Sequence, residues 1–360
     1  MKTIITLLAL TLGASAACAK TTVLTADRMI DVENGKLITN AVVVMEDNTI
    51  VAAGTKRSVT IPSDAEVMEL GDYTLMPGLM DMHVHLTSDA TKHGYKRLAD
   101  SLPRVTLTGV KHAEATLMAG FTTVRNVGAP GFADVALRDA INDGDIQGPR
   151  MFVSGPSLGV TGGHCDNNLL PYEFHSVSEG VADGPWAVRE IVRRNIKYGA
   201  TVIKFCGTGG VLSKGTKVGV QQYTFEEMQA LVDEAHMRGL TVATHAHGTS
   251  GIKTAIKAGV DSVEHVSLLD EVGIELALEH GTYFSMDIYV TEYILSEGEK
   301  AGILEESLAK ERIVGKRQRE NFQKAVKAGV KMVFGSDAGV YPHGDNGKQF
   351  SRMVRFGMTP

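Results

Sequence analysis

The sequence predicts an α/β fold, a (β/α)8 barrel, because strand-like and helix-like segments alternate from residue 73 onward. Segments with helical spacing, such as residues 224–238 and 308–328, separate short apolar runs that are rich in β-branched residues. Such runs are typical of strands buried on both faces of a parallel sheet, and eight of them favour a closed barrel over an open sheet. The eight runs are residues 75–85, 122–127, 151–154, 201–205, 241–245, 262–266, 283–288 and 331–335.

Residue types at the ends of the helical segments fit this interpretation. Thr224 and Glu227 have the spacing of a capping box, which predicts a helix that begins after Thr224. Glycine often follows the last turn of a helix because it adopts the left-handed conformation without strain. Glycines stand at that place, just before a predicted strand, at Gly120, Gly239, Gly259 and Gly329.

Two segments precede the predicted barrel. Residues 1–19 begin with a positive charge, continue with an apolar stretch and end in small residues, which is the layout of a secretory signal peptide. We therefore expect a secreted or periplasmic protein whose mature form has no membrane segment. Residues 20–72 alternate short β-rich runs with turns, so we expect a small, partial β-sandwich domain there, followed by the barrel at residues 73–360.

Composition narrows the class of protein. A hydrophobic content of 43% in 360 residues is enough for a sizeable core, and a net charge of −6 gives no support for a nucleic-acid partner. Beyond the predicted signal peptide, the cysteines are Cys165 and Cys206, and the sequence does not say whether they pair. We expect Cys206 to face away from the site and to have a packing role.

Polar side chains gather at the carboxyl ends of the predicted strands, where barrels of this class place their active sites. His83 and His85 alternate at the end of the first strand, so both imidazoles point to one face, as a pair of metal ligands would. The other side chains of this kind are Lys204, His245, His265 and Asp337, from the fourth, fifth, sixth and eighth strands. Together these residues supply ligands for two divalent metal ions.

Lys204 is the unusual member of this set. A lysine in a buried apolar strand is costly unless its charge is paired or removed. Formation of a carbamate on its amine removes the positive charge and creates an anion that can bridge two ions. His247 is left out of the ligand set because it lies past the predicted end of the fifth strand.

At these residues the chain resembles the metal-dependent amidohydrolase superfamily, in the subset with imidazolonepropionase-like and prolidase-like members. The motif Pro-Gly-Leu-Met-Asp-Met-His-Val-His at residues 77–85 and the order His-x-His, Lys, His, His, Asp carry the resemblance, which covers residues 21–360. Imidazolonepropionases have one metal ion and lack the lysine, so Lys204 favours the binuclear, peptidase-like branch. Relatives usually continue with a last helix and further strands, so we expect the C-terminal part to be truncated here.

The resemblance implies that six residues hold the two ions: His83 and His85 the more buried one, His245 and His265 the second, carboxylated Lys204 both, and Asp337 the buried one. Asp337 would also take a proton from the bridging water and pass it to the leaving nitrogen. Two divalent ions acidify a shared water to hydroxide and polarise the substrate carbonyl. We expect Zn²⁺ because the ligands mix histidine with carboxylate, although this ligation is also compatible with Mn, Co or Fe.

Relatives suggest two residues that contact the substrate. A histidine after a Gly-Gly step helps to hold the substrate, and a tyrosine forms a hydrogen bond near the scissile carbonyl. His164 and Tyr223 stand at the matching positions of this sequence. We therefore expect both residues to take part in catalysis.

Other residues near the strand ends have more open interpretations. Arg125 binds either an anionic end of the substrate or a neighbouring carboxylate. The glycine-rich residues 207–211 either cradle a carboxylate through backbone N–H groups or form a flexible loop. His343 and Asp345 lie in a loop that we expect to shape the pocket.

The resulting functional hypothesis is a hydrolase that cleaves the amide bond to a C-terminal amino acid, with a dipeptidase of the Xaa-Pro type as first choice. An amidase of N-acyl aromatic amino acids, such as an ochratoxin-type mycotoxin, and a cyclic-amide hydrolase are the enzymatic alternatives. A metal- or ligand-binding protein on the same scaffold is the non-enzymatic one. We expect a dipeptide or other small-molecule substrate and a homo-oligomer, although the sequence does not specify the number of subunits.

Overall fold

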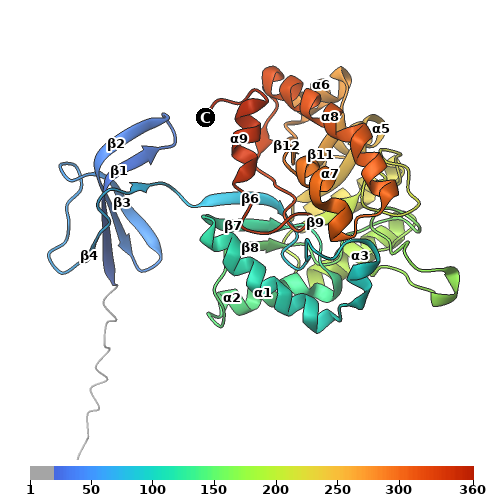
Figure 1. The fold of residues 1–360 in the computed structure, drawn as a ribbon, viewed down its shortest axis with the longest axis horizontal. Coiled ribbons are helices and arrows are strands. Elements are labelled where there is room, and N and C mark those ends of the chain that lie inside the picture. The colour runs from blue at the N-terminus through green and yellow to red at the C-terminus, as the bar shows by residue number, and fades with distance from the viewer. Residues whose placement is uncertain (1–19) are drawn as a thin grey trace, which may run out of the picture. The chain divides into compact units, whose positions relative to one another are not determined.

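The computed structural model describes residues 20–360, so the predicted signal peptide lies outside the described residues (Figure 1). The chain forms two compact units, and the boundary falls between Pro77 and Gly78. None of the helices in the described part is long and apolar enough to cross a membrane.

The N-terminal unit is one five-stranded sheet. Its strands are β1 (Thr21–Asp31), β2 (Lys36–Glu46), β3 (Thr49–Thr55), β4 (Glu66–Glu69) and β5 (Thr74–Leu75). The order is β3-β2-β1-β4, and β5 also pairs with β1. Val23, Val42 and Val44 form its small core. The predicted sandwich is not confirmed, because these strands pair into a single sheet.

Eight parallel strands form the centre of the second unit, and each overlaps one of the eight predicted runs. They are β6 (Leu79–Val84), β7 (Phe121–Asn126), β8 (Arg150–Val153), β9 (Ile203–Cys206), β10 (Val242–Gly248), β11 (Ser262–Leu268), β12 (Tyr283–Ser285) and β13 (Met332–Val333). They pair in chain order as a sheet β6-β7-β8 and a sheet β9-β10-β11-β12-β13.

The two sheets of the second unit are joined by isolated bridges rather than by continuous pairing. Leu158 pairs with Phe205 of β9, and Val84 of β6 pairs with Ala338. The first bridge lies beyond a break at Pro156, whose nitrogen has no hydrogen to donate to a neighbouring strand. The continuously closed barrel that we predicted is therefore not confirmed, although the strand order is the one such a barrel requires.

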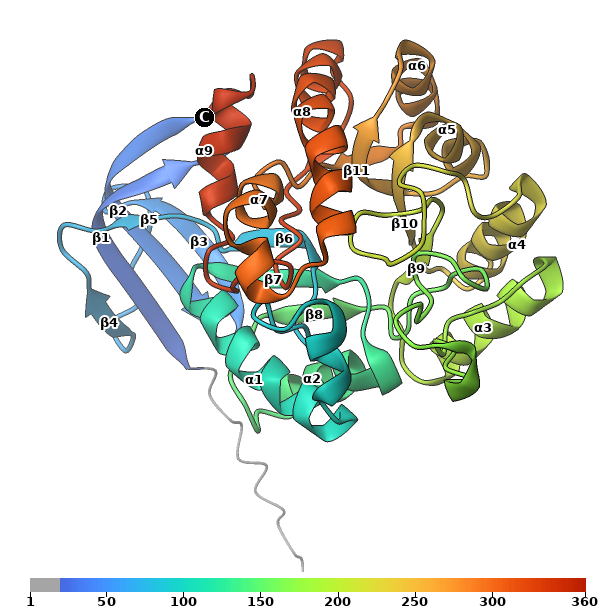
Figure 2. The same ribbon diagram turned by 45° about the vertical axis from the view of Figure 1, so that its right-hand side comes forward.

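Helices surround these strands on the outside (Figure 2). They are α1 (Leu102–Met118), α2 (Ala133–Asn142), α3 (Pro185–Lys197), α4 (Phe225–His236), α5 (Thr249–Lys257), α6 (Glu271–His280), α7 (Val290–Ala301), α8 (Glu305–Ala328) and α9 (Lys348–Arg355). The capping box predicted at Thr224 is confirmed at the start of α4. The four predicted glycines all have positive φ, between 74° and 93°.

Candidate metal centre

One cavity brings together seven of the eight side chains predicted to form the site. Its volume is about 730 Å³, and its wall includes residues at or after the carboxyl ends of the strands. The seven residues are His83, His85, His164, Lys204, His245, His265 and Asp337. They come from six of the eight strands or from the loops that follow them, as the sequence predicted.

Asp337 forms the first half of the centre together with the histidines of β6. Its Oδ1 is 3.3 Å from Nε2 of His83 and 3.4 Å from Nε2 of His85. Burial alone would raise the pKa of the Asp337 carboxyl, but the two histidines outweigh burial and hold this pKa well below its usual range. Possible ligand atoms of His83, His265 and Asp337 lie within 4.8 Å of one another, so two imidazoles and a carboxylate can bind one ion.

Glu264 on β11 fixes the orientation of His83. Nδ1 of His83 lies 3.0 Å from Oε2 of Glu264, which leaves Nε2 to face the cavity. Arg125 and Ser262 donate hydrogen bonds to the other oxygen of this carboxylate, each at 2.7 Å. Burial raises the pKa of Glu264, but Arg125 and His83 outweigh it and hold this pKa well below its usual range. Arg125 therefore binds a neighbouring carboxylate, which is one of the two alternatives that the sequence left open.

His265 is held in the same way by a second carboxylate. Its Nδ1 is 3.0 Å from Oδ1 of Asp287, and Gln318 on α8 donates to that oxygen at 2.8 Å. His265, Val266 and Asp337 adopt positive φ values of 70°, 53° and 58°. Each such residue costs about 1–3 kcal/mol of strain, and strain of this kind persists where the surrounding structure fixes a functional site.

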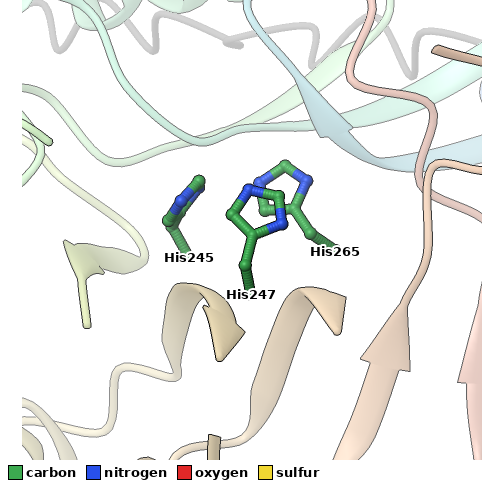
Figure 3. Close-up of side chains that lie close together, drawn as sticks. All are labelled: His245, His247 and His265. Carbon is green, nitrogen blue, oxygen red and sulfur yellow. The ribbon is translucent and has the colours of Figure 1, made fainter. Parts of the chain in front are cut away.

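A second group of histidines lies on β10 and β11 (Figure 3). Possible ligand atoms of His245, His247 and His265 lie within 4.8 Å of one another. Burial lowers the pKa of His245 and of His247 well below the usual range, so both rings are neutral, the form that binds metal. Nε2 of His245 is buried and has no hydrogen-bond partner in the part of the chain that the structure describes. Because an unpaired buried nitrogen is costly, this atom fits a role as a metal ligand.

His247 belongs to this cluster, and the early strand end for which it was left out of the predicted ligand set was wrong. β10 continues through Gly248, three residues past the predicted strand end, and His247 therefore shares a face with His245. Nδ1 of His247 is 2.8 Å from Oγ of Ser267. The alternating His-x-His pattern that identified the pair on β6 was also present here.

Lys204 on β9 lines the same cavity and is only 3% exposed. Its Nζ forms no hydrogen bond or ion pair with any residue from 20 to 360. Burial lowers the pKa of this amine to about 8. A buried amine without a partner fits the carbamate predicted from the sequence, because carboxylation removes its positive charge.

His164 lies over His245, in the segment between β8 and α3. The two rings stack with centroids 4.0 Å apart, and Nδ1 of His164 is 2.8 Å from Oγ of Ser213. A Cβ atom on Gly210 would lie 2.3 Å from the His164 ring. Glycine is therefore required at this position to make room for the imidazole.

The glycine-rich residues 207–211 have two backbone donors that are already used. The N–H groups of Gly207 and Gly209 donate to the carbonyl oxygens of His245 and Val220. These two donors are not available to a ligand, which limits a carboxylate cradle to the other N–H groups of the segment.

A disulfide between Cys165 and Cys206 adjoins both His164 and Lys204. Cys165 follows His164 directly, and Cys206 lies two residues after Lys204 on β9. Both cysteines line the cavity. The prediction that Cys206 faces away from the site was wrong, because residues two apart on a strand share a face.

The structure places Tyr223 apart from the cavity. This residue is 1% exposed within the apolar core, and its hydroxyl donates to the carbonyl oxygen of Ala182 at 3.1 Å. His343 and Asp345 do not line the cavity either. His343 stacks on His112 with ring centroids 4.5 Å apart, and Asp345 pairs with Lys348. The link of His343 to the site is the carbonyl oxygen of His85, which lies 3.2 Å from its Nε2.

Sequence reasoning missed the residues that orient the candidate ligands. They are Glu264, Asp287, Gln318, Ser267 and Ser213. Glu264 had a recognisable signal, since an acidic residue inside an apolar strand requires a partner. The two serines carried none, because a hydroxyl is acceptable in many strands and in almost any loop.

Comparison with known proteins identifies the family. A model of the amidohydrolase family matches residues 74–360. The chain belongs to this family. As an amidohydrolase, it is a hydrolase that acts on amide or peptide bonds, and the histidine groups agree with the general metal dependence of the family.

Several relatives of this amidohydrolase have described activities. Ochratoxinase from Aspergillus niger is 34% identical over 366 residues, which cover 95% of this chain and 74% of ochratoxinase. A solved structure of a Xaa-Pro dipeptidase with bound methionine is 36% identical, with a TM-score of 0.86 over 94% of this chain and 84% of that one. A prolidase complexed with N-methylphosphonate-L-proline is 32% identical, with a TM-score of 0.84 over 94% of this chain and 83% of that one.

Proposed function

We propose that this amidohydrolase is a binuclear metal-dependent enzyme that cleaves the amide bond to a C-terminal amino acid, foremost as a dipeptidase of the Xaa-Pro type. The observation that carries the proposal is the arrangement of Asp337 against two histidines on one side of the cavity, with the unpaired nitrogen of His245 on the other. The similarity to a Xaa-Pro dipeptidase and to a prolidase supports the choice of substrate.

The donors divide between two cations. His83, His85 and Asp337 would hold one ion, and His245 and His265 would hold the other. Zn²⁺ fits this mixture of imidazole and carboxylate. When bound, such ions acidify a water molecule and polarise the carbonyl of a substrate.

Lys204 would connect the two halves as a carbamate. Its neutral amine attacks CO₂, a nitrogen–carbon bond forms, and one proton leaves to solvent, so that the product carries a single negative charge. The cavity supports this step because the amine is buried, has no partner among residues 20–360 and has a pKa lowered to about 8. Mass spectrometry of the intact protein under native conditions would show the added CO₂, and its absence in fully metal-loaded protein would contradict this part of the proposal.

Asp337 and His164 would act on the substrate directly. The Asp337 carboxylate, kept ionised by its two histidines, accepts a proton from the attacking water and delivers it to the leaving nitrogen. His164 stacks on His245 and is fixed through Nδ1, so its ring forms a rigid wall against which the acyl part of the substrate is held.

A second candidate is supported by the 34% identity with ochratoxinase. In this case the substrate is an N-acyl aromatic amino acid in place of a dipeptide. Both candidates release an amino acid with a free carboxylate, and both use the same residues of the cavity.

The test is hydrolysis of a substrate panel by the metal-loaded enzyme, followed by mass spectrometry of the products. The panel contains Xaa-Pro dipeptides, other dipeptides, N-acyl-L-phenylalanines with ochratoxin A, and cyclic amides. We expect turnover of Xaa-Pro dipeptides above all others, and stronger turnover of the N-acyl aromatic compounds would favour the second candidate. If neither class is cleaved by fully loaded protein, both candidates fail, and cleavage of the cyclic amides would then identify a cyclic-amide hydrolase.

We also propose that the protein is exported and that residues 1–19 are removed. The Cys165–Cys206 disulfide supports export, because such bonds persist in oxidising compartments. N-terminal sequencing of the protein recovered from a periplasmic or culture fraction is expected to start near Lys20. Recovery of the uncleaved chain in the cytoplasm alone would overturn this proposal.

A further inference from the structure

Four lysine and arginine side chains of the described residues line the cavity, and they differ in whether a partner neutralises them. They are Lys92, Arg97, Lys204 and Lys214. Nζ of Lys92 lies 2.7 and 2.8 Å from the two carboxylate oxygens of Asp100, and Nζ of Lys214 donates to the hydroxyl of Tyr95 at 2.7 Å. Lys204 belongs to the metal centre.

Arg97 is the remaining cation, and no acceptor in residues 20–360 hydrogen-bonds or ion-pairs with its guanidinium. Arg97 is an exposed residue of the cavity wall, where partial desolvation lowers its pKa, yet arginine stays charged at any physiological pH. A charged, unpaired group in a cavity wall gains most from an anionic ligand, and the planar guanidinium matches a carboxylate in a bidentate pair.

The short helix that carries Arg97, Gly94–Ala99, is anchored at the turn between α7 and α8. The N–H of His93 donates to the carbonyl oxygen of Ala301 at 3.0 Å, and Nζ of Lys96 donates to that of Lys300 at 2.9 Å. Gly302 lies so close that a Cβ atom there would be 3.0 Å from the carbonyl oxygen of His93. The backbone that presents Arg97 is therefore fixed relative to the cavity.

His93 ties this helix to the loop of Asp337. Nε2 of His93 is 2.9 Å from the carbonyl oxygen of Val340, and the N–H of Val340 donates to the carbonyl oxygen of Asp337 at 3.1 Å. Burial lowers the pKa of His93, and the charges of Asp337 and Arg97 shift it further in opposite directions, so His93 lies within electrostatic range of both. The helix of Arg97 is thus tied to the segment that carries Asp337.

The side of the cavity matters because of the proton transfer proposed above. Asp337 delivers its proton to the leaving nitrogen, so the released amino acid must lie on the Asp337 side. The carboxylate of that amino acid is one carbon removed from the nitrogen. We propose that the guanidinium of Arg97 binds this α-carboxylate and thereby selects substrates with a free C-terminal carboxylate.

This inference rests on the proposed function, and the experiment separates the two. Metal-loaded wild type, Arg97→Met, Arg97→Lys and Lys92→Met are compared on Xaa-Pro and N-acyl-phenylalanine substrates and on the same compounds with the carboxylate converted to an amide. Calorimetry measures binding of L-proline and L-phenylalanine against their amides. Lys92→Met is the matched control, because it removes a cavity cation that is already paired with Asp100.

We expect the wild type to prefer the free acid by about 10- to 100-fold in kcat/KM and in affinity. Arg97→Met should lose that preference, mainly through a higher KM, while its activity on the amides stays unchanged. Arg97→Lys should keep part of the preference, and Lys92→Met all of it. Thermal unfolding verifies that each variant folds.

A preference that survives in Arg97→Met, or that Lys92→Met loses equally, would overturn the assignment of Arg97. Turnover by the wild type without any preference for the acid would overturn it too, while leaving the proposed function intact. If the wild type cleaves none of these compounds, the proposed function fails. The calorimetric preference then still decides the role of Arg97.

Discussion

The two halves of the metal centre are built from the same residue type but are supported differently. On the Asp337 side, His83 is backed by Glu264 and Arg125, a chain of buried charges in which every member has a partner. On the His245 side, the partner of His247 is the neutral hydroxyl of Ser267, and Nε2 of His245 has no partner within the described part of the chain.

This difference shows where the negative charge for the two cations comes from. The Asp337 side supplies a carboxylate ligand, and Glu264 lies behind His83. The His245 side supplies the neutral imidazoles of His245 and His247, with Asp287 behind His265, so a carbamate on Lys204 would be the negatively charged ligand of this side. We therefore expect damage to the first side to be severe and damage to the second to be milder.

The largest effect is expected from Asp337→Asn. The amide keeps the size of the side chain but cannot accept the proton of the attacking water, so kcat should fall by about 10²- to 10⁴-fold while metal remains bound. Steady-state kinetics and metal analysis of the same preparation measure both. Asp345→Asn, in the same loop but outside the cavity wall, is the control. Unchanged turnover in Asp337→Asn would exclude the proton transfer.

Glu264→Gln tests the charged support of the Asp337 side. The substitution leaves the buried Arg125 without its counter-charge, and breaking a buried ion pair costs about 3–5 kcal/mol of unfolding free energy. His83 also loses its orienting carboxylate, so metal affinity should fall by about 10- to 100-fold. Chemical denaturation and metal titration measure these losses. Losses no larger than those of Ser267→Ala would contradict the proposed difference between the two sides.

Glu311→Gln should change how the free energy of unfolding depends on pH, because Glu311 is buried in the cavity wall and forms no ion pair with the described residues. Burial raises the pKa of Glu311 to about 7, whereas in the unfolded chain this group ionises near 4.5. The protonated Glu311 contributes to the free energy of unfolding. This contribution is fully present below pH 4.5 and is lost as the pH rises through 7. Between pH 5 and pH 8 the free energy of unfolding of the variant should therefore rise by on the order of 2 kcal/mol relative to that of the wild type.

Denaturant unfolding at the two pH values tests this expectation. The exposed Glu279 on α6 offers a matched control in Glu279→Gln, which should show no relative gain. A difference between wild type and Glu311→Gln that stays constant with pH would show that Glu311 is ionised throughout.

The smallest effect is expected from Ser267→Ala on the His245 side. His247 loses one neutral hydrogen bond, which is worth about 1 kcal/mol, and metal affinity should fall by less than about 10-fold. Metal titration under the conditions used for Glu264→Gln gives the comparison. A loss as large as that of Glu264→Gln would mean that both sides depend equally on the groups behind their histidines.

Sequence patterns predicted the parts of the molecule that repeat or that have a fixed spacing. The alternation of apolar runs with helical segments predicted the eight strands, and the capping box predicted the start of α4. Position at a strand end predicted the metal-binding residues between His83 and Asp337 that line the cavity. The resemblance to a family assigned the individual roles.

The rest could not be predicted because it depends on contacts between distant segments. The end of β10 was placed too early, since local propensity does not show how far β11 supports it through Gly248. Tyr223 precedes α4 as predicted, but its hydroxyl is taken by Ala182, which lies in a different segment. The partner of Arg125 was undecided for the same reason, because Glu264 is 139 positions away along the chain.

The covalent bond between Cys165 and Cys206 has a consequence for how the enzyme is prepared. It closes a ring of chain with a sequence separation of 41, which in the chain-entropy model stabilises the folded state by about 4 kcal/mol. Protein made in a reducing host would contain every residue of the cavity but would lack the covalent link between the His164 segment and β9. Thiol titration should therefore accompany any report of low activity, since an inactive sample can be one that was never oxidised.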